Sequence, residues 1–222
     1  MFNINDKFVI LSLSMVNSIN LKKEKKIVNF TTPYIIEITA VKIELGEISE
    51  HLSYYTKIDK YNPNDYEFSD FEPLSNDLTP SHLIGANTLE YAISVLHTFC
   101  SDCTIIFTED KGSNLYKLDT LNFYSKTYGL MFNNPTLNFY DLLIADLLKK
   151  EIDADEWEYT DLIKIANMIN LANKPLDEIY IEYDINEKLI NSRKDSLTKT
   201  LAIAEIITKI LDFDESEEEI PF

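Results

Sequence analysis

The 222-residue sequence is poor in glycine, cysteine and basic side chains. Four glycines exclude a Gly-rich linker or a Gly-rich repeat array. Two cysteines, Cys100 and Cys103, do not make a disulfide framework for a chain this long. Only 20 lysines and arginines stand against 38 aspartates and glutamates, a net charge of −18 at pH 7. Such a surface repels phosphate backbones, so tight metal-free binding to duplex DNA is disfavoured.

The sequence also lacks long hydrophobic runs. None reaches the roughly 20 residues that a membrane-spanning helix needs, and residues 1–6 lack the basic and apolar parts of a signal peptide. We therefore expect a cytoplasmic protein. Hydrophobic residues make up 45% of the chain, with twelve Phe and thirteen Tyr, enough for an ordinary core. We expect residues 1–211 to form one domain and residues 212–222 a flexible acidic interaction tail.

Hydrophobic periodicity predicts the element order β-β-β-α-β-α-β-α-α-α. Strands are predicted at residues 8–13, 34–45, 51–58, 103–107 and 136–140. Helices are predicted at residues 88–100 (with Thr88 as N-cap), 113–128, 141–150, 159–172 and 194–211. The polar stretches 17–26 and 62–77 are interpreted as a turn and a loop. Three antiparallel strands followed by alternating helices and strands predict an α/β fold, with a mixed sheet flanked by helices.

Several segments resemble, in the same order along the chain, the DnaQ-type (DEDD-type) 3′–5′ exonucleases. They are YIIEITAVKI at residues 34–43 with Gly46 after it, CTIIFTEDKGSNLYKL at 103–118, FYDLL at 139–143, residues 160–170, and LAIAEI at 201–206. The resemblance runs from about residue 8 to residue 211. It implies a ribonuclease-H-like fold for nearly all of the predicted domain.

In that family four carboxylates hold two divalent metals, and a His or Tyr acts as general base. The metals clamp the scissile phosphate and activate a water molecule. The resemblance places other side chains at these positions. Ser12 and Ser14 stand in the first motif (Asp-x-Glu), and Lys194 and Lys199 stand in the last (His-x-x-x-x-Asp). The second motif has Asn114 or, if the alignment shifts by one residue, Ser113. Hydroxyl, amide and ammonium groups do not form a carboxylate ligand set for Mg²⁺. We therefore expect no catalytic residues, no metal and no cofactor.

Two alternatives remain open at these positions. Lys194 and Lys199 are either solvated helix residues or cations that grip a phosphate in place of the metals. Glu109, Asp110 and Asp195 lie near the motif positions and would, if they form a displaced site, give an active Mg²⁺- or Mn²⁺-dependent exonuclease.

Two further patterns have competing interpretations. His97-x-x-Cys100-x-x-Cys103 has spacing that suggests zinc, but a structural site needs four ligands and no second cysteine pair exists. Small buried thiols in the core are the alternative. The basic cluster Lys22-Lys23-Glu24-Lys25-Lys26 is predicted in a loop near the cleft of this fold. It is either a solvated loop or a nucleic-acid contact.

The last residues of the sequence combine an acidic stretch with an apolar end. Carboxylates steer such a peptide toward a basic rim, and Pro221 keeps it stiff. Phe222 offers a ring for a pocket, and its terminal carboxylate offers two acceptors for an Arg. The ending resembles the C-terminal peptide of bacterial single-stranded-DNA-binding proteins, which many replication and repair proteins read. The residues predicted to bind a partner are Asp212, Phe213, Asp214, Glu217, Glu218, Glu219, Ile220, Pro221 and Phe222.

The sequence thus predicts a non-catalytic interaction protein of DNA replication or repair. Its expected partners are replication, recombination and repair factors that bind the single-stranded-DNA-binding protein tail. Nucleic-acid binding is expected to be weak or indirect, and no membrane is implied. The alternatives are an active metal-dependent 3′–5′ exonuclease and a divergent single-stranded-DNA-binding protein.

Overall fold

The computed structural model describes residues 6–71, 78–108, 111–152, 179–181, 183–185 and 196–211, without the side chains of residues 69–71, 111–115 and 147–152. In chain order the elements are β1 (Phe8–Leu21), β2 (Lys26–Glu44), β3 (Glu47–Tyr55), η1 (Pro63–Asp65), β4 (Tyr66–Phe71), η2 (Pro80–Leu83), α1 (Leu89–Phe99), β5 (Thr104–Phe107), α2 (Lys111–Thr127), β6 (Thr136–Asn138), α3 (Phe139–Ile152) and α7 (Ser196–Leu211).

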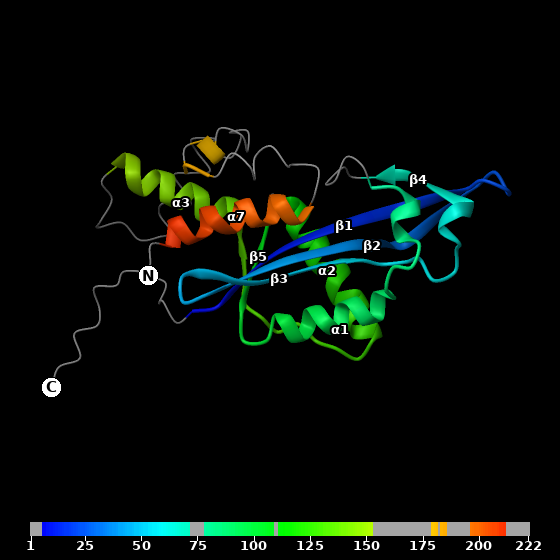
Figure 1. The fold of residues 1–222 in the computed structure, drawn as a ribbon, viewed down its shortest axis with the longest axis horizontal. Helices are drawn as coiled ribbons and strands as arrows, with labels where there is room; N and C mark the ends of the chain where they lie inside the picture. The colour runs from blue at the N-terminus through cyan, green and yellow to red at the C-terminus, as the bar shows by residue number, and fades with distance from the viewer. Residues whose placement is uncertain are drawn as a thin grey trace.

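The strands form one mixed sheet in the order β3-β2-β1-β5-β6, and β4 pairs with the far end of β1 (Figure 1). The β1–β2 and β2–β3 pairs are antiparallel, whereas β5 and β6 add in parallel beyond β1. The mixed sheet predicted from the sequence is therefore confirmed. Its central strand is β1, which is the strand that carries the predicted first motif.

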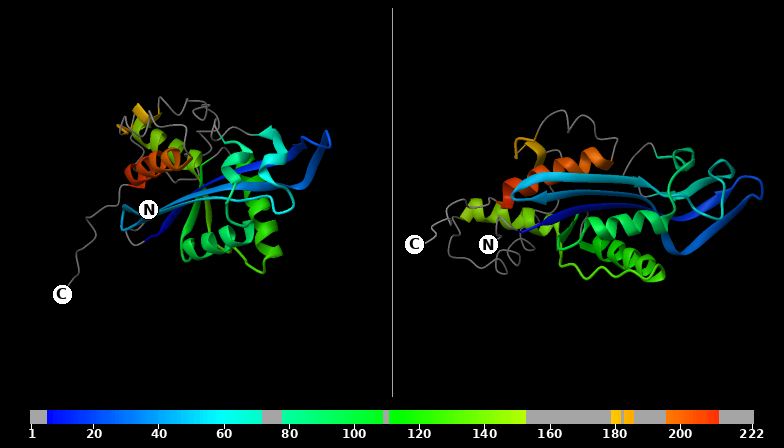
Figure 2. Two further views of the ribbon diagram at one scale, coloured as in Figure 1. Left: turned by 45° about the vertical axis from the view of Figure 1, so that its right-hand side comes forward. Right: turned by 60° about the horizontal axis from the view of Figure 1, so that its bottom comes forward.

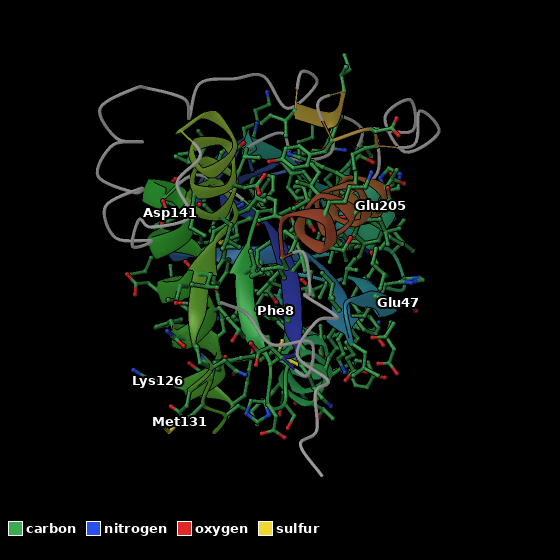
Figure 3. The ribbon with its side chains drawn as sticks, turned by 90° about the vertical axis from the view of Figure 1, so that its left-hand side faces the viewer. Phe8, Glu47, Lys126, Met131, Asp141 and Glu205 are labelled. Carbon is green, nitrogen blue, oxygen red and sulfur yellow. The ribbon has the colours of Figure 1, made fainter. Side chains whose placement is uncertain are left out.

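Helices cover both faces of the sheet (Figure 2). The pleat of β1 sends alternate side chains into two cores. Phe8 and Ile10 pack with α3 and α7, while Val9 and Leu11 pack with α1. Viewed along the sheet, Phe8 lies in its middle, between the two helix layers (Figure 3). An apolar run without alternation, as in residues 8–13, is typical of a strand buried on both faces.

The predicted helices in the described part are confirmed within a few residues. Thr88 caps α1 by accepting a hydrogen bond from the Tyr91 amide at 3.2 Å. The predicted helices 113–128 and 194–211 correspond to α2 and α7. The predicted helix 159–172 lies outside the described residues. None of the helices in the described part is long and apolar enough to span a membrane.

Two polar stretches that the sequence assigned to loops are partly strand. β1 continues to Leu21, and residues 66–71 of the predicted loop 62–77 form β4 beside it. The reason is a third core cluster that includes Ile19 and Tyr66, both of them fully buried. The polar neighbours of these two residues mask that apolar pattern in the sequence. The turn predicted over residues 17–26 is confirmed at residues 22–25, whereas residues 17–21 and 66–71 were wrongly assigned and form strands.

The basic cluster lies at the tip of the β1–β2 hairpin, at the end of the molecule where β4 lies (Figure 1). Eight residues of strand separate Ser14 from Lys22, about 26 Å at the usual rise. The prediction that this cluster lies near the cleft was therefore wrong. Lys22 pairs with Glu67 at 3.7 Å and Lys23 pairs with Asp65 at 2.8 Å. Such exposed ion pairs stabilise a fold little but neutralise part of the tip.

Candidate functional site

A polar cluster interrupts the otherwise apolar face of the sheet beneath α7. Ser12 and Ser14 continue the side of β1 on which Ile10 packs against the helices. In the register with β2, Ser12 stands opposite Thr39 and Ser14 stands opposite Glu37. All four polar side chains are between 0% and 6% exposed. Polar side chains buried this deeply need partners, so their hydrogen bonds define the site.

Glu37 is the centre of this cluster. Its Oε2 atom accepts hydrogen bonds from the Ser14 hydroxyl at 2.7 Å and from the Ser196 hydroxyl at 2.8 Å. Ser14 belongs to β1 and Ser196 is the first residue of α7. The single carboxylate oxygen thus ties β1, β2 and α7 together, which places α7 over the sheet.

The start of α7 also suits a negative charge. The first turn of a helix carries a partial positive charge from its free amides, and a nearby carboxylate is favoured there. Glu37 is bonded to the first residue of this helix. Burial of a carboxylate is costly unless hydrogen bonds and favourable dipoles offset it. The two hydroxyls and the helix end each offset part of that cost.

Two atoms of the cluster have no hydrogen-bond partner among the described residues. They are the Oε1 atom of Glu37 and the hydroxyl of Thr39, and both are buried. Residues 37 and 39 lie on the same face of β2, because side chains of a strand alternate. The cluster is therefore polar but incompletely satisfied, which is unusual for a site that serves only to fill space.

The described residues do not fit a two-metal centre. The cluster offers one carboxylate, and one oxygen of that carboxylate already accepts two hydrogen bonds. Within the described ranges, no group of three or more His, Cys, Asp or Glu side chains is placed to hold a metal ion. Magnesium is normally held by more than one carboxylate or by added phosphates. We therefore derive no metal-dependent step from this cluster.

The structure brings some of the sequence-predicted positions together. Ser12 and Ser14 lie side by side in the cluster, and Lys199 follows Ser196 in the first turn of α7, half-buried. Asn114 lies in α2, but its side chain is outside the described part. Lys194, the three acidic residues of the alternative displaced site (Glu109, Asp110 and Asp195) and the segment 212–222 also fall outside the described residues. The roles assigned to all of these residues stay predictions.

The sequence analysis missed Glu37 as a site residue. The sequence does contain a signal for this residue. Glu37 is the one charged residue between Lys26 and Lys42, and it interrupts a run of Ile, Thr, Ala and Val. Ionised side chains are rarely buried without a specific partner. An isolated acid inside an apolar strand is therefore worth testing as a site residue.

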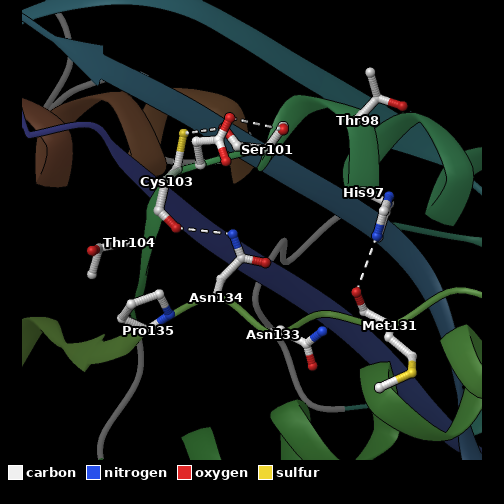
Figure 4. Close-up of a pocket in the computed structure, with 10 residues that line it drawn as sticks. His97, Thr98, Ser101, Cys103, Thr104, Met131, Asn133, Asn134 and Pro135 are labelled. Carbon is white, nitrogen blue, oxygen red and sulfur yellow. Dashed lines mark hydrogen bonds between the residues drawn. The ribbon is translucent and has the colours of Figure 1, made fainter.

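The two cysteines are part of the core beside α1. Cys100 and Cys103 are 0% and 2% exposed, and the Cys103 thiol donates to the Ser101 carbonyl at 3.3 Å. His97 is directed elsewhere: its Nε2 bonds the carbonyl of Met131 at 3.0 Å (Figure 4). Figure 4 also shows Asn134 bonded to the Cys103 carbonyl along the wall of a cavity of about 680 Å³. These contacts support the core interpretation rather than zinc.

Both thiols are expected to react slowly in the folded chain. Burial raises the pKa of Cys100 to about 12, and burial also raises the pKa of Cys103. Because the thiolate is the nucleophile, the raised pKa lowers the reactive fraction of both thiols at pH 8. Labelling with an aromatic disulfide reagent should be on the order of a hundredfold slower in buffer than in urea. Rapid labelling of two thiols in the folded chain would contradict this placement.

Comparisons with known proteins add evidence on the fold. No protein-family model matches the sequence, and no curated protein matches it significantly. Among solved structures, E. coli Exonuclease I in complex with an oligonucleotide is similar over 92% of this chain, with a TM-score of 0.55 and 10% identity. The chain spans about 40% of that protein's length. The match to a full-length 3′-exonuclease covers 94% of this chain and 82% of that protein, with a TM-score of 0.45 and 11% identity. The match to a 3′-exonuclease that recognises the histone mRNA stem-loop covers the same shares, with a TM-score of 0.37 and 14% identity. With the sheet order β3-β2-β1-β5-β6, the likeness to Exonuclease I shows that this chain has the ribonuclease-H-like fold of 3′–5′ exonucleases.

Proposed function

We propose that this chain is a non-catalytic exonuclease-fold protein of DNA replication or repair. In this proposal it acts by docking the acidic Ile-Pro-Phe segment at residues 212–222 onto proteins that bind the tail of single-stranded-DNA-binding protein. The observation that supports the non-catalytic part is the cluster of Ser12, Ser14 and Glu37 under α7. These side chains are 1–6% exposed.

A two-metal nuclease requires several carboxylates around an accessible phosphodiester. At the positions where the family resemblance places two of those carboxylates, β1 carries the hydroxyls of Ser12 and Ser14. The one carboxylate beside them, Glu37, is already bonded to Ser14 and Ser196. This arrangement stabilises the contact between α7 and the sheet.

The docking part of the proposal rests on the sequence of residues 212–222. Six of these eleven residues are acidic, and they precede Ile220-Pro221-Phe222. The net charge of −18 favours basic protein surfaces as partners over nucleic acid. Helicases, recombination mediators, primase, exonucleases and a clamp-loader subunit are the classes of protein to examine. The chain would either recruit them or compete for them.

A capture experiment from bacterial lysate tests the docking part. The intact chain is compared with a chain that lacks Phe222 and with Phe123→Ala, which removes an exposed phenyl ring from α2. We expect replication and repair proteins to be captured by the intact chain and by Phe123→Ala, and to be lost without Phe222. Recovery of the same proteins without Phe222 would show that the segment does not dock.

A nuclease assay tests the non-catalytic part independently. The chain is incubated with 3′-ended single strands in the presence of Mg²⁺ or Mn²⁺. We expect no release of nucleotides. Metal-dependent release by a clean preparation, abolished by substitution of Glu109, Asp110 or Asp195, would instead establish the displaced exonuclease site.

A further inference from the structure

A second concave site lies at the opposite end of β3 from the C-terminal end of α7. The loop after β3 and the turn that follows η2 enclose a cavity of about 450 Å³. This volume is within the range of about 300–1,000 Å³ that is typical of ligand pockets. Its apolar wall includes Tyr61, Pro63 and Ile84, and Ile84 is 57% exposed. An exposed aliphatic side chain beside a cavity is a ready apolar contact for a ligand.

Two lysines stand at this cavity without a carboxylate partner. Lys57 and Lys60 both line it, and neither forms an ion pair with a described residue. Among the described lysines, Lys7, Lys22, Lys23 and Lys42 pair with a carboxylate. The cavity therefore has two cations at its wall in a chain whose net charge is −18. Their chemistry favours an acidic ligand.

Asp59 also lines the cavity and places one carboxylate beside the two lysines. Burial raises the pKa of the Tyr34 phenol, and the Asp59 carboxylate raises it further. Asp59 likewise contributes, after burial, to the raised pKa of Tyr128. Tyr34 lies beside the cavity, because its hydroxyl donates to the carbonyl of Lys57, a lining residue, at 2.8 Å. With Asp59 counted, the charged residues that line the cavity carry a net charge of +1, which still favours an acidic ligand.

We propose that this cavity receives residues 212–222 of a second copy of the chain. The segment supplies what the cavity lacks: six carboxylates for the two lysines, and Ile220-Pro221-Phe222 for the apolar wall. The contact is separate from the docking proposed above. Self-association can fail while partner capture holds, and the reverse is equally possible.

The geometry favours a second copy over the same chain. Leu211, the last residue of α7, packs in the core cluster that includes Ile43 and Ile48, at the start of β3. The cavity begins at Lys57, two residues after Tyr55, the last residue of β3. The nine residues of β3 span about 30 Å. Eleven residues reach at most about 40 Å when fully extended, so contact within one chain would cost nearly all the freedom of the segment.

Sedimentation equilibrium of the full-length chain tests this contact. We expect concentration-dependent self-association that weakens at high salt. The double substitution Lys57→Glu/Lys60→Glu and the single substitution Phe222→Ala should each weaken it by about tenfold or more. Lys25→Glu/Lys26→Glu, which makes the same charge change at the hairpin tip, should leave it unchanged.

Mixing the two weakened variants gives the decisive result. The lysine variant keeps an intact segment 212–222, and Phe222→Ala keeps an intact cavity. Their equimolar mixture should therefore associate more strongly than either variant alone. A monomeric unmodified chain, a lysine variant that associates normally, or a mixture that does not associate would each overturn the proposal.

Discussion

Replacement of Ser14 by Asp is expected to destabilise the fold by about 3–5 kcal/mol when no divalent cation is present. The Ser14 hydroxyl lies 2.7 Å from the Oε2 atom of Glu37, and both side chains are 1% exposed. Aspartate at this position would place two carboxylates in contact in a site with little water. Like charges at such a distance cannot both remain ionised without a cation between them.

The same substitution should make stability depend on divalent metal. Two carboxylates, with the hydroxyls of Ser12 and Thr39 nearby, offer the oxygen ligands that Mg²⁺ and Mn²⁺ prefer. Urea unfolding of Ser14→Asp should therefore shift to higher denaturant when Mg²⁺ or Mn²⁺ is added, by linkage to the folded state. The unmodified chain should show a much smaller shift.

Ser14→Asn is the matched control, because it has the size of Asp without the charge. We expect it to cost less than Ser14→Asp and to show no metal response. Equal destabilisation by Ser14→Asp and Ser14→Asn, with no response of either variant to metal, would contradict the prediction. It would mean that a carboxylate at position 14 does not contact the Glu37 carboxylate.

The element order was predictable because apolar periodicity is strong in the core of this chain. β1, with Phe8 and Ile10 facing one core and Val9 and Leu11 the other, has the continuous apolar run of a strand buried on both faces. Thr88 caps α1 as its sequence position predicts. The end of β1 and its pairing with β4 were not predictable in this way. There, Ile19 and Tyr66 meet across strands far apart in sequence, which local pattern cannot show.

The role of Glu37 was not predictable from the sequence. The resemblance of local segments pointed to Ser12 and Ser14, two residues apart on one face of β1, and their assignment as motif positions stays a prediction. The resemblance gave no indication that Glu37 would be the residue that joins them to α7. That contact spans 159 positions between Glu37 and Ser196, and it depends on how α7 crosses the sheet. Such non-local geometry leaves no periodic signal in the sequence.

One carboxylate joins α7 to the sheet. The Oε2 atom of Glu37 on β2 accepts hydrogen bonds from the hydroxyls of Ser14 on β1 and Ser196 on α7. Glu37 then has a structural role that can be measured without any assay of activity.

Substitution of Glu37 by Ala should therefore cost about 3 kcal/mol of unfolding free energy. It removes the acceptor of two buried hydroxyls, Ser14 and Ser196, and it leaves a cavity between the sheet and the start of α7. Glu37→Gln is the matched control: its carbonyl oxygen can still accept from both hydroxyls, but its amide nitrogen takes the place of Oε1, which has no partner among the described residues. We therefore expect a cost of about 1–2 kcal/mol, smaller than that of Glu37→Ala. Urea unfolding gives the free energies, and amide hydrogen exchange should show faster exchange at the beginning of α7 in Glu37→Ala than in Glu37→Gln. If Ala and Gln behave alike in both measurements, the carboxylate contributes only bulk to this contact, and the joining of α7 to the sheet must rest on the apolar side chains around Ile203 and Ile207 alone.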